Sequence, residues 1–285
     1  MRAPVIALAM SLAVAAIPAF DAAHADTLDT IRSRGLLIIG YRPDAPPFSS
    51  VDNLNRAQGY SIDLCNRIAD AVKTKLGMSD LKVQYVPVTA ENRIDKLESG
   101  AIDIECGSTT RTLGRQERVD FTLFTFITGT EMLVRVSSDI RGPDNLKGKK
   151  IAVQPGTTTE AVVKRLVAAN GAQIMPVKTS DEGVAEVESG QADAYASDQI
   201  VLVGIATSSM SPKDLRLTGQ LYSYEPYALM VRRNDAAFRL IADRTLALTY
   251  DSENIAKIWQ QWFSQTFPDP PAIIKLMYAM QSLEP

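Results

Sequence analysis

Polar side chains that could bind a small carboxylate follow several predicted strands of this chain. Arg42 follows the first apolar run, Arg93 follows the second strand, and Arg115 lies shortly after the third. A guanidinium group can bind a carboxylate through two parallel hydrogen bonds, so arginines in these places suit an anionic ligand. Asp198 follows a later strand and could bind an ammonium group. Other polar residues follow strands in the same way: Ser108, Thr110, Thr157, Thr158, Thr159 and Ser197.

Three aromatic residues, Tyr41, Phe48 and Tyr60, lie near these positions in the sequence, and their rings could cover the aliphatic part of a ligand. Taken singly, such signals have ordinary explanations: an arginine after a strand is common on a solvated surface, and a run of threonines can be a helix cap. The recurrence of these residues after successive strands is what favours a binding cleft.

The elements that would position these residues alternate between strand and helix. Residues 36–40 form a continuous apolar run, typical of a strand buried on both faces, and apolar residues recur at helical spacing over 62–72. The pattern begins again with a strand at 151–153. Further strands are predicted over 81–86, 101–105 and 174–177, and helices over 92–97, 159–169, 236–248 and 252–263.

An internal echo indicates two similar lobes. The segment 97–103 (LESGAID) resembles 187–193 (VESGQAD), and in each a helix ends at a glycine suited to a left-handed cap. Long β-like stretches, 121–134 and 222–231, suit crossovers. We predict an α/β protein in which each lobe is a mostly parallel sheet flanked by helices, with the ligand cleft between the lobes. The first lobe would hold residues 26–128 and 225–285, and the second 129–224.

The first residues indicate export. Arg2 precedes an apolar run over 5–17 that is too short to span a bilayer, and Ala23-His24-Ala25 has the small-x-small form of a signal-peptidase site. Residues 1–25 are therefore predicted to be a signal peptide cleaved near Ala25, which places the mature protein in the periplasm. No cysteine follows this point directly, which argues against a lipid anchor. A buried N-terminal helix is the alternative.

The composition argues against several classes of function. His24 is the single histidine and lies in the predicted signal peptide, so a histidine triad, a histidine base and most zinc sites cannot be built from the mature chain. The formal charge of −3 and the absence of Lys/Arg runs argue against nucleic acid. Gly156-Thr157-Thr158 lacks the lysine and glycine spacing of a P-loop. We expect a monomer with no metal and no cofactor.

Two cysteines, Cys65 and Cys106, remain after the predicted cleavage. In an oxidising compartment an even number suggests one disulfide. Two isolated buried thiols are the alternative, because the sequence alone does not show that the two residues meet.

Several motifs resemble those of one protein family. Gly59-Tyr60-Ser61-Ile62-Asp63-Leu64, followed by an amphipathic helix, is similar to the signature of family 3 periplasmic solute-binding proteins, although the signature prefers an acidic residue where Ser61 stands. The segments 105–110 (ECGSTT), 92–94 (NRI) and 156–158 (GTT) resemble the glutamate/aspartate-binding branch. The resemblance implies the type II periplasmic binding-protein fold. It also implies L-glutamate or L-aspartate as the ligand and an ABC transporter permease in the inner membrane as the partner.

The resemblance implies roles for the residues that would bind the α-substituents of an amino acid. Arg115 would bind the α-carboxylate, with help from Thr110 and Thr158. Asp198 would hold the α-ammonium, with Ser108 and Thr110. The second lobe would rotate onto the first when the ligand binds, adding Thr158 and Asp198 to the site.

The resemblance also assigns the other end of the ligand. Arg42 and Arg93 would receive the side-chain carboxylate, and Ser180 falls near the position of a histidine that helps to bind it. Three arginines and one aspartate leave an excess of positive charge, which favours an acidic ligand, because mismatching a buried charged group costs about 2–5 kcal/mol. Since Ser180 is neutral, glutamine or asparagine could also be carried.

Two other functions stay open on the sequence. Some proteins of this fold are dehydratases or lytic enzymes, for which Glu105 and Glu160 would be the candidate acids. A sensory binding protein that reports to a membrane receptor could have an identical pocket, so the mature sequence does not separate it from a transport protein.

Overall fold

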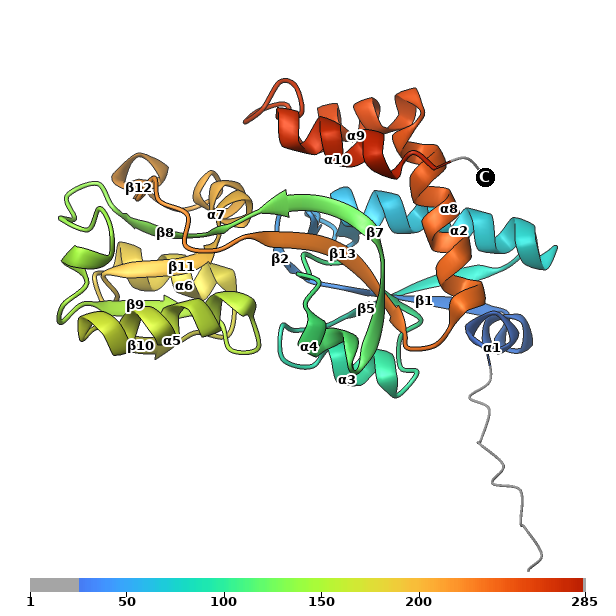
Figure 1. Ribbon diagram of the computed structural model, residues 1–285, viewed down its shortest axis with the longest axis horizontal. Helices are drawn as coiled ribbons and strands as arrows, with labels where there is room; N and C mark the ends of the chain where they lie inside the picture. The colour runs from blue at the N-terminus through green and yellow to red at the C-terminus, as the bar shows by residue number, and fades with distance from the viewer. Residues whose placement is uncertain (1–25, 284–285) are drawn as a thin grey trace, which may run out of the picture.

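The computed structural model describes residues 26–283, so the predicted signal peptide lies outside the described residues. Two five-stranded sheets form the centres of two lobes (Figure 1). The first sheet has the order β5-β1-β6-β13-β7 and the second the order β10-β9-β11-β8-β12. The strands of the first sheet are β1 (Leu36–Tyr41), β5 (Lys82–Pro87), β6 (Ile104–Glu105), β7 (Val119–Thr128) and β13 (Glu225–Arg232). Those of the second are β8 (Thr130–Arg135), β9 (Lys150–Val153), β10 (Gln173–Pro176), β11 (Ala194–Asp198) and β12 (Leu215–Leu217).

The prediction of two α/β lobes is confirmed, but both sheets are mixed. In each sheet the first three strands of the order pair in parallel and the last two pair antiparallel. The antiparallel strands include the crossovers: the predicted stretch 121–134 divides into β7 and β8, one in each sheet, and β13 returns to the first sheet. The chain thus passes between the sheets close to residues 128/129 and 224/225, where the sequence places the lobe boundaries; that division stays a prediction.

Helices flank both sheets, and the second lobe has its own set (Figure 1). A small third sheet, which was not predicted from the sequence pattern, lies near the start of the chain beside α2. It consists of β2 (Asp44–Ala45), β3 (Ser49–Val51) and β4 (Ala57–Gln58). The first-lobe helices are α1 (Thr27–Arg34), α2 (Tyr60–Leu76), α3 (Arg93–Glu98), α4 (Leu113–Gln116), α8 (Ala236–Tyr250), α9 (Glu253–Phe263) and α10 (Ala272–Gln281). The second-lobe helices are α5 (Thr158–Asn170), α6 (Ser180–Glu188) and α7 (Gln199–Ala206), with 3-10 turns at Pro143–Asn145 and Pro212–Asp214.

The internal echo corresponds to the same junction in both lobes. Gly100 and Gly190 have φ of 75° and 79°, in the left-handed region that glycine adopts without steric cost. The strands begin four residues later, at Ile104 and Ala194, and not directly after the glycine as the sequence suggested for both lobes. The intervening residues form a turn in which Asp103 and Asp193 each accept a hydrogen bond of 2.8 Å from a backbone N–H of the neighbouring strand. Each aspartate side chain therefore ties its turn to the neighbouring strand.

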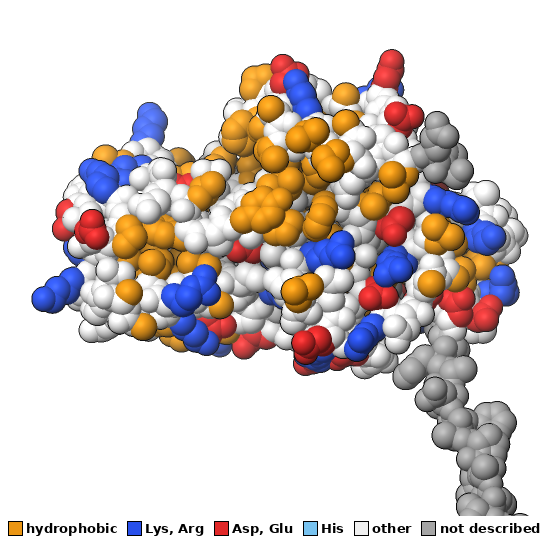
Figure 2. Space-filling model, in the orientation of Figure 1, with side chains coloured by type: hydrophobic (Ala, Val, Ile, Leu, Met, Phe, Trp, Pro, Cys, Tyr) orange, Lys and Arg blue, Asp and Glu red, His pale blue; other side chains and the backbone are white. Residues whose placement is uncertain are grey.

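An aromatic cluster forms the core of the first lobe between the sheet and the C-terminal helices. Phe126 of β7 stacks on Phe263 of α9, with 5.1 Å between ring centroids, and on Trp259 at 6.0 Å. Removing the large apolar surface of such rings from water is the main contribution to the packing of a helix against a sheet. Outward-facing residues of α10, such as Leu276 and Met280, remain exposed, and hydrophobic side chains gather over the C-terminal helices in Figure 2. Among residues 26–283, no helix is long and apolar enough to cross a membrane.

Candidate functional site

A small cavity lies where the two lobes meet. Its free interior of about 20 Å³ has room for about one water molecule, so the two lobes lie close together around it. Its lining includes six of the seven residues that the sequence predicts for ligand binding, all but Arg115, together with Ser180 and residues that the sequence did not point to, such as Gln154. The six are Arg42, Arg93, Ser108, Thr110, Thr158 and Asp198.

Arg115 lies beside the cavity and joins the two lobes. Its guanidinium donates to the carbonyl of Thr110 at 2.7 Å and, across the lobe boundary, to the carbonyl of Gly156 at 3.2 Å. Burial lowers the pKa of Arg115, although the surrounding carboxylates Glu105 and Glu225 offset part of this effect. The guanidinium therefore has two neutral acceptors and no direct ion pair among the described residues.

The three aromatic residues predicted to pack on a ligand do not line the cavity. Phe48 and Tyr60 are fully buried in the aromatic cluster, with ring centroids 6.0 Å apart, and the Tyr60 hydroxyl donates to the carbonyl of Thr125 at 2.8 Å. Tyr41 is buried in the same core. The three residues are close to loops in the sequence, but their rings are buried in the hydrophobic core. Burying the apolar surface of an aromatic ring is strongly favourable.

Asp198 ends β11 and faces the first lobe. Its carboxylate accepts hydrogen bonds from the buried Tyr227 hydroxyl and, at 3.3 Å, from the Thr159 hydroxyl. Burial, followed by the charge of Glu225, raises the pKa of Asp198 to about 6, against the hydrogen bond from Tyr227. A carboxylate with a raised pKa in a closed cavity is stabilised by a cation, which is the chemistry expected of an ammonium site.

Glu225, at the start of β13, is a member of the site that the sequence did not reveal. It is 2% exposed, and one of its oxygens accepts hydrogen bonds from Thr110 at 2.6 Å and from Thr158 at 2.7 Å. Ser223 donates to its other oxygen at 2.5 Å. Thr110 and Thr158 come from different lobes, so the Glu225 carboxylate bridges the two lobes through the hydroxyls that the resemblance assigns to an α-carboxylate.

Arg93, at the start of α3, is 2% exposed. Its Nη1 donates to the hydroxyl of Thr109 at 2.6 Å, and Thr109 in turn donates to Glu105 at 2.7 Å. Its Nε is buried without a hydrogen-bond partner. Burial, and then the positive charge of Arg115, lower the pKa of Arg93 to about 9, while Glu105 offsets only part of the effect. Arg93 is thus a buried cation that its surroundings stabilise incompletely.

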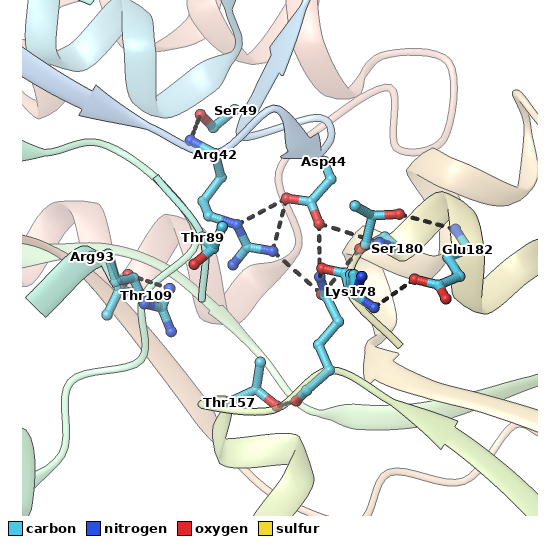
Figure 3. A network of polar contacts seen from close by, with 12 residues as sticks. Arg42, Asp44, Ser49, Thr89, Arg93, Thr109, Thr157, Lys178, Ser180 and Glu182 are labelled. Atoms are coloured by element: carbon cyan, nitrogen blue, oxygen red, sulfur yellow. Dashed lines mark hydrogen bonds and ion pairs between the residues drawn. The ribbon is translucent and has the colours of Figure 1, made fainter. Parts of the chain in front are cut away.

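Arg42 is also buried, but it has a carboxylate partner. Both its Nε and its Nη2 lie 2.8 Å from Oδ1 of Asp44, and Nη2 donates to the side-chain Oε1 of Gln154 at 3.3 Å. Figure 3 shows Arg42, Asp44 and Ser180 close together at the lobe boundary, with Arg93 and Thr109 apart from them. The charge count of three arginines and one aspartate is therefore incomplete, because Asp44, Glu105 and Glu225 also lie against these arginines.

The two glutamates considered as possible catalytic acids have structural contacts. Glu160 accepts a hydrogen bond from the backbone N–H of Gly156 at 3.0 Å and pairs with Lys164 at 2.7 Å, and this pairing lowers its pKa. Glu105 is fully buried and accepts the hydrogen bond from Thr109. Within residues 26–283, no group of three or more His, Cys, Asp or Glu side chains is placed to hold a metal ion.

The expected disulfide is present. Cys65 of α2 and Cys106, which follows β6, are bonded to each other. The bridge ties α2 to the segment that carries Ser108 and Thr110, so it anchors one wall of the cavity to the core of the first lobe.

Four residues at the site were not predicted from the sequence, and the sequence indicates some of them more clearly than others. Asp44 lies two residues after Arg42 in the same loop, so its acidic charge next to a candidate arginine was a usable signal. Gln154 directly follows β9, so it lies at the end of a strand as the predicted site residues do. Glu225 and Tyr227 lie on a crossover strand, and only the return of that strand to the first sheet brings them to the cavity.

Comparisons with known proteins point to one family. The model of bacterial extracellular solute-binding proteins, family 3, matches residues 37–265. The chain is 35% identical to the glutamate/aspartate import solute-binding protein of Escherichia coli K12 over 98% of this chain and 94% of the relative. It is 37% identical to the L-glutamate/L-aspartate-binding protein of Pseudomonas aeruginosa, over 89% and 84% of the two chains.

Solved structures show the same fold. A cysteine-binding protein from Campylobacter jejuni aligns with a TM-score of 0.77 and 26% identity, covering 88% of this chain and 98% of that one. An ancestral amino-acid-binding protein, a precursor of cyclohexadienyl dehydratase, aligns with a TM-score of 0.72 and 30% identity, covering 84% and 100%. From the family match over most of its length and these full-length relatives, the chain belongs to family 3 of the bacterial extracellular solute-binding proteins.

Proposed function

We propose that this protein is the periplasmic substrate-binding component of an amino-acid ABC transporter and that it binds L-glutamate or L-aspartate. The observation that carries the ligand assignment is the state of Arg93. Its guanidinium is buried, its Nε has no partner and its pKa is lowered to about 9, so an anionic group in the adjoining cavity would stabilise it. The relatives named for glutamate and aspartate support the same ligand class.

In this proposal the α-ammonium binds at Asp198 and the α-carboxylate at Arg115, Thr110 and Thr158, which lie at the lobe boundary. The side-chain carboxylate then reaches Arg93. Because the groups come from both lobes, a ligand would favour the closed arrangement by contacting both at once. The closed protein would present a surface of both lobes to a permease, as a monomer without a cofactor. The predicted division of the chain, with residues 26–128 and 225–285 in one lobe and 129–224 in the other, is part of this proposal.

Calorimetric titration tests the ligand assignment. Protein unfolded, freed of bound ligand and refolded would be titrated with L-glutamate, L-aspartate and L-glutamine. We expect micromolar or tighter binding of at least one acid. Binding of glutamine alone would refute the acidic ligand while keeping an amino-acid site. Binding of none of the three would refute both and favour an enzyme, such as a dehydratase acting on a small carboxylate, which incubation with candidate substrates would then reveal.

The transport role needs a separate test. Addition of the liganded protein to proteoliposomes that contain the permease and its ATPase should stimulate ATP hydrolysis, whereas a sensory protein should not do so.

A further inference from the structure

Asp44 places a carboxylate of the protein itself against Arg42, Gln154 and Ser180, three residues that line the cavity. It lies in β2 of the first lobe, and its side chain is 11% exposed. Oδ1 lies 2.8 Å from both Nε and Nη2 of Arg42. Oδ2 accepts hydrogen bonds from the side-chain amide of Gln154 at 2.7 Å and from the backbone N–H of Ser180 at 3.2 Å, both in the second lobe. The carboxylate therefore has four donors from two lobes.

These donors are the ones that a second carboxylate on a ligand would use. A guanidinium, a side-chain amide and a backbone N–H at the start of helix α6 together form a site for a planar anion. Burial acts to lower the pKa of Arg42, but Asp44 outweighs it and the pKa is raised. Burial likewise acts to raise the pKa of Asp44, but Arg42 and the other donors lower it. Both directions show that the two charges already stabilise each other.

We propose that Asp44 determines the side-chain specificity of this protein by occupying Arg42. The inference rests on the proposed function as an amino-acid-binding protein. An acidic ligand then interacts with Arg93 at its distal end but meets the negative charge of Asp44 instead of a free Arg42. An amide side chain meets no such repulsion and can donate a hydrogen bond to a carboxylate. Asp44 thus narrows the difference in affinity between glutamate and glutamine, and the site accepts both.

Asp44 also links the lobes, so its removal would weaken closure around any ligand. That effect changes all affinities in the same direction. The informative quantity is therefore the ratio of the glutamate affinity to the glutamine affinity, in which a common change in closure cancels and only the interaction with the ligand side chain remains.

Calorimetric titration of Asp44→Asn with both amino acids tests the proposal, with Asp44→Ser as a second variant should the first fold poorly. Glu182→Gln is the matched control. Glu182 lies on α6, the helix that begins at Ser180, and accepts a hydrogen bond from the backbone N–H of Lys178 at 2.6 Å. Figure 3 shows its side chain away from Arg42. We expect the glutamate-to-glutamine ratio to rise about tenfold or more in the Asp44 variants and to change less than threefold in Glu182→Gln.

The outcomes separate this inference from the proposed ligand. An unchanged ratio in the Asp44 variants, with tight glutamate binding by the wild type, would overturn the role of Asp44 and leave the proposed function intact. A wild type that binds glutamine only, with glutamate binding gained in Asp44→Asn, would support Asp44 and refute the acidic ligand. No binding of either amino acid by any variant would overturn both. An equal rise in Glu182→Gln would also overturn the inference, because it would indicate a general effect of charge.

Discussion

Arg42 and Arg93 are the same residue type, in the same lobe and nearly equally buried, yet they differ in charge balance. Asp44 outweighs the burial of Arg42, so the pKa of Arg42 is raised. Arg93 faces Arg115 and reaches Glu105 only through Thr109, so burial dominates and its pKa falls to about 9. An arginine in a cleft is therefore available to a ligand only if no carboxylate of the protein already pairs with it.

The largest effect expected from this difference is on ligand binding. Arg93→Ala should weaken glutamate binding by about 2–5 kcal/mol, or thirtyfold and more, because the ligand carboxylate would lose its incompletely stabilised partner. Arg118→Ala is the control, since Arg118 is half-exposed on the same lobe and should change the affinity by less than threefold. Titration calorimetry measures both. An Arg93→Ala protein with wild-type affinity would remove Arg93 from the site.

Loss of the disulfide should have the next largest effect, this time on stability. Cys106 directly follows Glu105, on the Arg93 side of the cavity, and the bridge closes a loop with a sequence separation of 41. Replacing both cysteines by serine should lower the free energy of unfolding by about 2–4 kcal/mol in urea titrations. Reduction of the wild type should reproduce the shift. Equal stability of the double variant and the oxidised wild type would contradict the prediction.

A double-mutant cycle compares the two arginines directly. Arg42→Ala and Asp44→Ala should show a coupling in unfolding free energy of about 1–3 kcal/mol, because the two side chains are in contact and largely buried. The corresponding cycle for Arg93 and Glu105 should give less than half of that value, because a threonine separates them. Similar coupling in the two cycles would show that the difference between the arginines is not one of pairing.

The pH dependence of binding should show the smallest effect. Burial and Glu225 raise the pKa of Asp198 to about 6, and only the ionised form attracts an ammonium group. Affinity should therefore be constant above about pH 7 and fall about tenfold between pH 6.5 and pH 5, because the cleft must lose a proton to bind.

The ionisation of Asp198 should change the stability of the ligand-free protein in the direction opposite to its effect on ligand affinity. The folded state binds the proton more tightly than the unfolded chain does, so this residue alone makes folding less favourable as the pH rises from about 4 to 6. Asp198→Asn should remove both dependences, which titration calorimetry and urea unfolding at a series of pH values would detect. A pH-independent affinity in the wild type would exclude Asp198 as the ammonium site.

The sequence by itself determined the alternation of strands and helices, the two similar lobes and most of the residues at the cavity. Apolar runs, helical spacing and glycine caps act over a few residues, so they can be read locally. The residues after β1, β9 and β11 could be placed in the cleft because the ends of parallel strands meet at one edge of a sheet.

Only the tertiary structure decided which of these residues are free to act. Arg42 pairs with the nearby Asp44 and also contacts Gln154, which is 112 positions away in the sequence. Glu225 accepts a hydrogen bond from Thr110, which is 115 positions away. The burial of Phe48 and Tyr60 in the core likewise follows from helix α9, which arrives about 200 residues later. Charge balance and burial depend on all neighbours in space, and a linear pattern records only those in sequence.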